Sequence, residues 1–194
     1  RTSGVNKKLN GVTFSIDKFV AVGKQGTLLT SPDGTTWTAQ TSGTTNDLYK
    51  VNYGNNTYIA TGDTGTILTS ADGITWIVQT SGTTKPLRGV TYGNNAFVVV
   101  GYDGTILTSP NGTTWTAQTS GTTKSLEGVT YGNNHFVAVS NDDGGTVIIL
   151  TSPDGATWSQ QPSGTISLRS ITSANSTFVT VGEGGRILTS SVET

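Results

Sequence analysis

The sequence repeats one segment along most of its length. A Ser-x-Asp/Asn-Gly-x-Thr-Trp motif occurs four times, and its tryptophans are 39, 39 and 43 residues apart. Before each motif, a run opens at a leucine and leads into an aromatic residue, and a fifth such run follows the last motif. A fixed period near 40 residues indicates one supersecondary unit that is copied and stacked. The motifs are Ser31–Trp37, Ser70–Trp76, Ser109–Trp115 and Ser152–Trp158, and the opening leucines are Leu9, Leu48, Leu87, Leu126 and Leu168.

One copy of the repeat predicts four short strands. In the third copy, Leu87–Tyr92 alternates apolar and other residues, and Phe97–Val100 is a continuous apolar run typical of a buried strand. The Gly-Asn-Asn segment between them favours the positive backbone angles of a tight hairpin. Two further strands are expected at Thr105–Thr108 and Thr114–Gln118.

Four antiparallel strands per copy predict the blade of an all-β, five-bladed β-propeller. No part of the repeat has the 3.6-residue period of a helical solenoid, and a parallel β-helix would need fewer residues per coil and no hairpins. We expect one domain over residues 1–194, with units at approximately 1–40, 41–79, 80–118, 119–161 and 162–194.

The two ends of the sequence match parts of one unit. The fifth copy ends where its motif and tryptophan strand should follow, and Arg1–Gly4 aligns with Gln79–Gly82 at the end of a tryptophan strand. We therefore expect an incomplete last blade that the N-terminal residues could close, because unpaired sheet edges are usually protected. A larger ring, or strands exchanged between chains, remains an alternative.

The composition excludes several classes of partner. Charged residues make up 12% of the chain and the net charge is −1, so we expect neither nucleic-acid binding nor membrane insertion. The chain has no cysteine and no methionine and begins with Arg1, so we expect a piece of a larger protein. Its Gly, Thr, Ser and Asn content is typical of secreted or surface-displayed all-β proteins.

The motif carries a family resemblance that covers essentially the whole chain. Ser31–Trp37 resembles the Asp box, or bacterial neuraminidase repeat, and Phe19–Ser31 is similar to propellers related to the photosystem II stability factor. Similar repeats occur in bacterial surface proteins. The resemblance implies a propeller fold but no particular function. It also implies a structural role for Asp33, Asp72, Asn111 and Asp154, which would lock their turns, and for Trp37, Trp76, Trp115 and Trp158, which would pack beneath them.

The copies differ mainly at one edge of the expected propeller. The motif turns and the Gly-Asn-Asn turns share one edge, while the loops between second and third strands share the other. On the second edge, the residue after each opening leucine varies from copy to copy. These five residues, expected around the mouth of a central channel, are Asn10, Tyr49, Arg88, Glu127 and Arg169.

This edge is the candidate ligand site, because polar-ligand pockets combine aromatic, charged and amide groups. Tyr49 and Tyr102 could stack on sugar rings, while Asp63, Asp103, Glu127 and Arg88 could bond hydroxyl groups. The alternative is that Arg88 with Glu127, and Arg169 with a neighbour, form ion pairs that fill a narrow channel. An insertion in the fourth copy, residues 141–145, lies on the same edge; its Asp142 and Asp143 match no calcium-loop motif.

The sequence is compatible with three functions. The first is a non-catalytic carbohydrate-binding module, with a glycan or polysaccharide as partner and no cofactor or metal, in a monomeric part of a larger extracellular protein. The second is a protein-binding or spacer propeller. The third is a sialidase-like hydrolase, whose nucleophilic Tyr, acidic partner and Arg cluster would fall on Tyr49, Glu127, Arg88 and Arg169. Only four arginines and the lack of long loops disfavour this enzyme, and His135 is expected to be a solvated turn residue.

Overall fold

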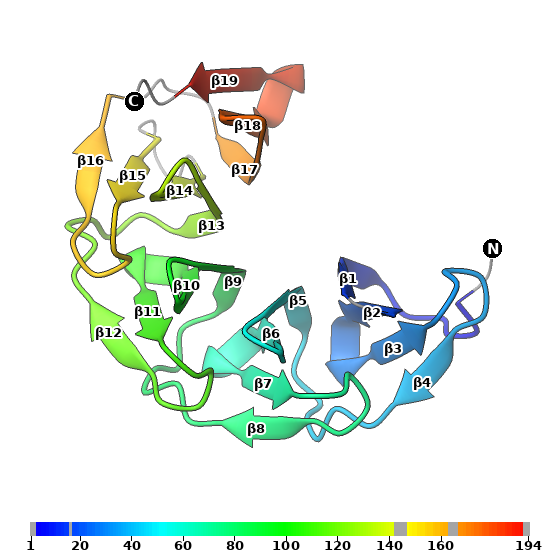
Figure 1. Ribbon diagram of the computed structural model, residues 1–194. Helices are drawn as coiled ribbons and strands as arrows, with labels where there is room; N and C mark the ends of the chain where they lie inside the picture. The colour runs from blue at the N-terminus through cyan, green and yellow to red at the C-terminus, as the bar shows by residue number, and fades with distance from the viewer. Residues whose placement is uncertain (1–2, 16, 142–146, 163–166, 192–194) are drawn as a thin grey trace.

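The protein is a five-bladed β-propeller with its blades arranged in an arc, as seen in a computed structural model (Figure 1). The structure describes residues 3–15, 17–141, 147–162 and 167–191. Within them, four sheets have four strands each and the fifth, β17-β18-β19, has three. In every sheet the strands are antiparallel and follow one another in chain order.

Each blade begins with a long inner strand and a second strand that returns beside it. The inner strands are β1 (Leu9–Ser15), β5 (Leu48–Gly54), β9 (Leu87–Gly93), β13 (Leu126–Gly132) and β17 (Leu168–Ala174). The second strands are β2 (Lys18–Gly23), β6 (Thr57–Gly62), β10 (Ala96–Gly101), β14 (His135–Ser140) and β18 (Thr177–Gly182).

The third and fourth strands are shorter and lie toward the outside of the arc. The third strands are β3 (Leu28–Ser31), β7 (Ile67–Ser70), β11 (Ile106–Ser109), β15 (Ile149–Ser152) and β19 (Ile187–Ser191). The fourth strands are β4 (Thr38–Gln40), β8 (Ile77–Gln79), β12 (Thr116–Gln118) and β16 (Ser159–Gln161). One-turn 3₁₀ helices join second to third strands at η1 (Lys24–Gly26), η2 (Asp63–Gly65), η3 (Tyr102–Gly104) and η4 (Glu183–Gly185).

Local sequence explains the hairpins between first and second strands. Asn94 and Asn95 have φ angles of 44° and 59°, and the equivalent asparagines Asn55 and Asn56 have 45° and 56°. Asparagine tolerates this left-handed region better than most residues, which is why Asn-rich pairs form the turn of such hairpins. The sequence prediction for these turns is confirmed.

The core lies between successive blades. Val98, Val100 and Ile106 of the third blade pack with Leu126 and Phe136 of the fourth, and all five side chains are essentially inaccessible to solvent. Equivalent clusters join the first blade to the second and the second to the third. Each internal blade is therefore buried on both faces, as its continuous apolar strands predict.

The ring is open between the first and last blades. Val5, Asn6 and Lys7 lie beside β3 and β4 of the first blade, where they line a hollow with Leu28 and Gln40. No N-terminal segment of the described chain pairs with the last sheet; Arg1 and Thr2, with which the predicted closing segment Arg1–Gly4 begins, lie outside the described residues. Among the described residues, no helix is long and apolar enough to cross a membrane.

Candidate functional site

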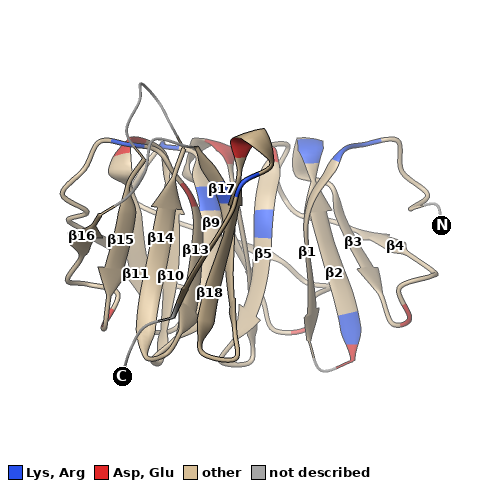
Figure 2. Cartoon of the chain, turned by 90° about the horizontal axis from the view of Figure 1, so that it is seen from above, with Lys and Arg blue, Asp and Glu red and all other residues tan. Residues whose placement is uncertain are grey.

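The two edges of the propeller differ in charge. The 3₁₀ turns and the beginnings of the inner strands form one edge, which we call the cavity edge; the Asn-rich hairpins and the Ser-x-Asp/Asn-Gly turns form the opposite edge, the motif edge. Figure 2 shows most Lys, Arg, Asp and Glu residues gathered along the cavity edge. The charged side chains are therefore concentrated where the repeats differ in sequence.

At the motif edge, each turn is fixed by its own side chains. In the second blade, Asp72 Oδ1 accepts hydrogen bonds from the backbone N–H groups of Ile74 and Thr75, both at 2.8 Å. Ser70 Oγ accepts the N–H of Gly73 at 2.8 Å, and the indole of Trp76 donates to the Gly73 carbonyl at 2.9 Å. The backbone hydrogen bonds stabilise the carboxylate and lower the pKa of Asp72 to about 2.

The other motif turns repeat this arrangement. A hydrogen bond from the Thr35 hydroxyl, with the backbone bonds of Thr36 and Thr35, lowers the pKa of Asp33, and backbone bonds from Thr157 and Ala156 lower that of Asp154. Asn111 has no charge, yet its Oδ1 accepts the N–H groups of residues 113 and 114 at 2.9 and 3.0 Å. Because an amide oxygen suffices, the turn requires an acceptor and not an acid.

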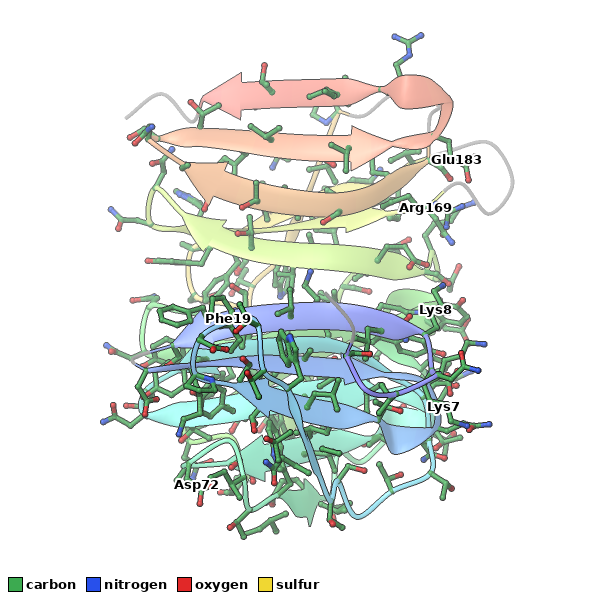
Figure 3. The ribbon with its side chains drawn as sticks, turned by 90° about the vertical axis from the view of Figure 1, so that its right-hand side faces the viewer. Lys7, Lys8, Phe19, Asp72, Arg169 and Glu183 are labelled. Atoms are coloured by element: carbon green, nitrogen blue, oxygen red, sulfur yellow. The ribbon has the colours of Figure 1, made fainter. Side chains whose placement is uncertain are left out.

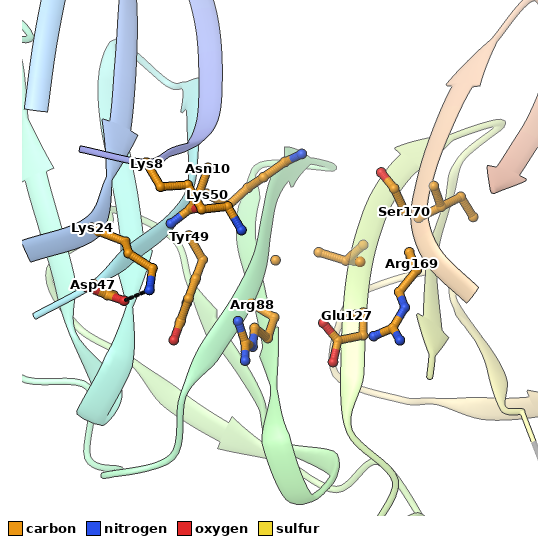
Figure 4. Close-up of a pocket in the computed structure, with 14 residues that line it drawn as sticks. Lys8, Asn10, Lys24, Asp47, Tyr49, Lys50, Arg88, Glu127, Arg169 and Ser170 are labelled. Carbon is orange, nitrogen blue, oxygen red and sulfur yellow. Dashed lines mark ion pairs between the residues drawn. The ribbon is translucent and has the colours of Figure 1, made fainter. Parts of the chain in front are cut away.

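At the cavity edge, a hollow of about 520 Å³ lies at the inner ends of the blades (Figure 4). The side chains that follow the opening leucines all line it, as the repeat alignment predicted. Each of these residues sits at a register shift between the first and second strands of its blade. Such β-bulges redirect a side chain relative to the regular pleat. The five residues are Asn10, Tyr49, Arg88, Glu127 and Arg169.

Arg88 is held between two tyrosine rings. Its Cζ lies 3.9 Å from the ring centroid of Tyr49 and 4.7 Å from that of Tyr102, and its Nη2 donates a hydrogen bond to the Tyr102 hydroxyl. Both cation–π contacts favour the charged guanidinium. Desolvation on its own lowers the pKa of Arg88, but the Tyr102 hydrogen bond and electrostatic interactions with Tyr49, Tyr102 and Glu127 outweigh it, so the net pKa is raised.

Tyr49 and Asp63 form a second contact of this cluster. The Tyr49 hydroxyl donates to Asp63 Oδ1, and one face of its ring is covered by Arg88. Burial, followed by the hydrogen bond to Asp63, raises the pKa of Tyr49. The protonated phenol is therefore favoured and the phenolate disfavoured.

The remaining predicted site residues have partners of their own. Asn10 Nδ2 donates to the Leu48 carbonyl at 2.8 Å, and Glu127 Oε1 accepts from Asn141 Nδ2 at 3.1 Å. Arg169 pairs with Glu183 of the same blade. Arg169 therefore has an ion-pair partner, although the two side chains are 50% and 58% exposed, and the rings that contact Arg88 are aromatic.

Three predicted site residues do not belong to the lining of the hollow: Asp63, Tyr102 and Asp103. Asp103 is exposed and pairs with Lys85. Tyr102 and Asp63 reach the site through their contacts with Arg88 and Tyr49. The suggested Asp142 and Asp143 lie outside the described residues, within which no cluster of metal-ligating side chains occurs. The His135 ring lies against the Asn133 carbonyl in its hairpin.

The sequence prediction missed three lysines and one aspartate in the cavity lining. Lys8 and Asp47 immediately precede the opening leucines, Lys50 follows its leucine by two positions, and Lys24 begins η1. Lys24 Nζ lies 3.9 Å from Asp47 Oδ2. Aligning the copies one position before and two positions after each leucine would have revealed Lys8, Asp47 and Lys50, because other copies have Pro, Ser or Gly there.

Comparisons with known proteins support the fold alone. No family model and no curated protein sequence matches this chain. Among solved structures, YCF48 from Cyanidioschyzon merolae matches with a TM-score of 0.73 at 19% identity, over 100% of this chain and 70% of that one. A structure of YCF48 bound to D1 peptide gives 0.74 at 19% identity, over 96% and 66% of the two chains. Virginiamycin B lyase from Staphylococcus aureus gives 0.79 at 13% identity, over 99% and 72%.

The similar structures include both an enzyme and a peptide-bound protein. At identities below 20%, they share the β-propeller architecture with this chain and say nothing about its ligand.

Proposed function

We propose that this chain is a non-catalytic recognition module that binds an acidic carbohydrate in its central cavity. The observation that carries the proposal is the charge of the cavity lining. Five cationic side chains and two acidic ones line the hollow, in a chain whose net charge is −1. Clustered cations at a concave site attract anions and increase their local concentration. The lining cations are Lys8, Lys24, Lys50, Arg88 and Arg169, and the acids are Asp47 and Glu127.

The contacts of Arg88 suggest how a carboxylate would be held. Stacking between Tyr49 and Tyr102 fixes the guanidinium plane, which limits the side-chain entropy lost on binding. An arginine that is held in this way can present its remaining N–H donors to a uronate carboxylate. The uncovered face of Tyr49 could add a sugar stacking contact.

A catalytic role is less well supported. A sialidase-like mechanism needs an activated tyrosine, whereas burial and the Asp63 hydrogen bond raise the pKa of Tyr49. We therefore favour binding over hydrolysis.

An acidic peptide is the second candidate ligand. It is favoured by the same cationic lining and by the fold similarity to YCF48, one structure of which is bound to D1 peptide. A peptide carboxylate and a uronate carboxylate offer the arginine the same acceptor geometry, so the two must be separated by experiment.

The proposal extends to family and location. We infer an origin among Asp-box propellers from the four turns in which a Ser hydroxyl, an Asp or Asn oxygen and a Gly amide make the same bonds. The cysteine-free, Thr- and Asn-rich composition supports a place in a secreted or cell-surface bacterial protein.

The test is a calorimetric titration with three ligands of similar length: an oligogalacturonate, a neutral glucan oligomer and an oligoglutamate peptide. We expect the oligogalacturonate to bind best, with an affinity that falls as salt increases. Arg88→Ala should weaken its binding about tenfold or more, because a charge-assisted hydrogen bond contributes about 1.5–3 kcal/mol.

Lys85→Ala is the matched control. It removes one positive charge on the same edge but outside the cavity, where Lys85 pairs with exposed Asp103. We expect its affinity to stay within about twofold of the parent value. Equal binding of the neutral glucan, or equal losses in both variants, would refute the carbohydrate site, and preferential binding of the peptide would select the second candidate.

A further inference from the structure

The first blade exposes an apolar face that every internal blade buries. Val12 of β1 is 60% exposed, whereas its counterparts Val51, Val90 and Val129 are 2%, 2% and 8% exposed. Figure 3 views the molecule from the right-hand side of Figure 1 and shows the first and the last blade on the side that faces the viewer. This face has the composition of a blade interface and no neighbouring blade.

The last blade exposes the opposite face in the same way. Val181 is 44% exposed and Ile187 is 66% exposed, whereas the counterparts Val100 and Ile106 in the third blade are 0% and 1% exposed. Two apolar faces therefore remain without a blade against them, one at each end of the arc.

These two faces are the complementary halves of one interface. Between the third and fourth blades, Val100 and Ile106 of the leading blade pack against Leu126 and Val129 of the following one. Val181 and Ile187 repeat the leading half, and Leu9 and Val12 repeat the following half. Such a head-to-tail interface closes into a ring when the rotation per unit permits.

A groove of about 690 Å³ between the last two blades points to the same conclusion. Val137 and Thr151 line its fourth-blade side. One interface earlier, the equivalent residues Val98 and Thr108 lie against Gly155 of the next motif turn. The groove is therefore the position that a motif turn and a fourth strand of the last blade would occupy. Among its described residues, the last sheet has neither.

The comparison with YCF48 suggests how many units the opening would take. This chain covers 70% of the YCF48 chain, so the uncovered 30% is close in length to two of the five units of this chain, and we take two units as the expected filling of the opening. A complete second copy of this chain has five blades, so it would overlap the first copy after filling the opening.

We propose that the open faces are a docking site for two further units of this same four-stranded repeat, which complete a closed ring. A motif turn and a fourth strand, which precede the two units, fill the groove and complete the last blade. The second added unit covers Val12 and Leu9 of the first blade.

The test is a series of extended chains. In each extended chain, a copy of residues 71–118 follows Ser190. Its first part, residues 71–79, supplies the missing turn and fourth strand of the last blade, and residues 80–118 add one unit. One or two further copies of residues 80–118 give the two-unit and three-unit chains. Because the chain has no cysteine, Val12→Cys introduces a unique thiol. We expect labelling of this thiol to be fast in the parent and one-unit chains and at least about tenfold slower in the two-unit chain, since a buried thiol reacts only after local opening.

Val51→Cys is the matched control, because Val51 occupies the same position in the second blade and is already buried. Its thiol should react slowly at every chain length. Fast Val12→Cys labelling in a folded two-unit chain would overturn the proposal. Concentration-dependent protection in the parent chain would overturn it as well, because it would make a second copy the occupant.

A two-unit chain in which Val51→Cys also reacts quickly has not folded. The same two units are then placed before residue 3, so that the ring closes from the other end, with Ile187→Cys as the reporter and Ile106→Cys as its buried control. If this chain also leaves its reporter reactive, the proposal is wrong.

Discussion

The motif edge and the cavity edge are built by the same strands, but they depend on sequence in different ways. At the motif edge, each copy makes the same turn with the same bonds, even where Asn111 replaces aspartate. At the cavity edge, the five bulged positions carry five side chains of which only Arg88 and Arg169 are alike. The comparison suggests that the repeated edge stabilises the blades and that the varied edge determines what the propeller binds.

The largest expected effect is on stability at the motif edge. Trp76 is 9% exposed and donates to Gly73, so Trp76→Ala should lower the free energy of unfolding by about 3–5 kcal/mol, as removal of a buried aromatic typically does. Chemical denaturation measures the loss. Trp37→Ala is the control, because Trp37 is only partly buried in a blade with no blade before it. A loss as large at Trp37 as at Trp76 would contradict the role of inter-blade packing.

A substitution at the cavity edge should change affinity without changing stability. Glu127 contributes negative charge to a cationic lining, so Glu127→Gln should raise the affinity for oligogalacturonate about fivefold, since one partly screened charge is worth about 1 kcal/mol. Glutamine keeps an acceptor for Asn141, and the unfolding midpoint should not move. Unchanged affinity, measured by titration at low salt, would remove Glu127 from the binding surface.

Two substitutions of Asp72 distinguish the effect of losing a hydrogen-bond acceptor from the effect of losing a negative charge at the motif edge. Asp72→Ala should cost about 1 kcal/mol at pH 7 because two backbone N–H groups lose their acceptor, whereas Asp72→Asn should change stability by less than about 0.5 kcal/mol, as the natural Asn111 turn indicates.

The pH dependence gives a second readout for Asp72. Its folded pKa of about 2 is below the ordinary aspartate pKa of 3.8, so its carboxylate stabilises the fold above pH 3.8, and this contribution is lost as the pH falls toward 2. Denaturation of Asp72→Asn between pH 5 and about pH 2 should show a shallower loss of stability than the parent. Equal slopes would show that the turn does not depend on this carboxylate.

A small effect on stability is expected at Tyr49. Tyr49→Phe removes one partly buried hydrogen bond to Asp63 and should lower stability by less than about 1 kcal/mol. Because the folded pKa of Tyr49 is raised, its contribution is present below the unfolded pKa and is lost as the pH rises above it. Absorbance titration of the folded variant should lack the phenol that resists ionisation longest, and a titration identical to that of the parent would contradict this assignment.

Much of the fold could be predicted because its signals are local. The Asn-Asn hairpins, the motif turns and the four strands per unit each depend on residues within about ten positions of one another, and the repeat period then requires stacking. The outer strands are shorter than predicted: β12 begins at Thr116, because the backbone N–H of Thr114 bonds the Asn111 side chain in the motif turn and not a neighbouring strand. The side-chain bond overrides the local strand pattern there.

The candidate site could be predicted only in outline. Aligning the copies brought Asn10, Tyr49, Arg88, Glu127 and Arg169 to one cavity, because equivalent positions in a radial repeat face the same axis. The alignment could not show that Arg88 stacks on Tyr49 of the preceding blade as well as on Tyr102 of its own. That contact depends on the rotation between blades and on the bulges, which no single repeat encodes.

The sequence by itself determined the unit, its turns and the edge at which the copies differ, since all of these follow from short-range bonding and from comparison of equivalent positions. The tertiary structure alone decided how far the blades rotate around the axis. That rotation leaves Val12 and Ile187 exposed at the two ends of the arc, and it sets which charges share the central cavity. The physical reason is that packing between blades sums small rotations over the whole chain, and no local segment contains that sum.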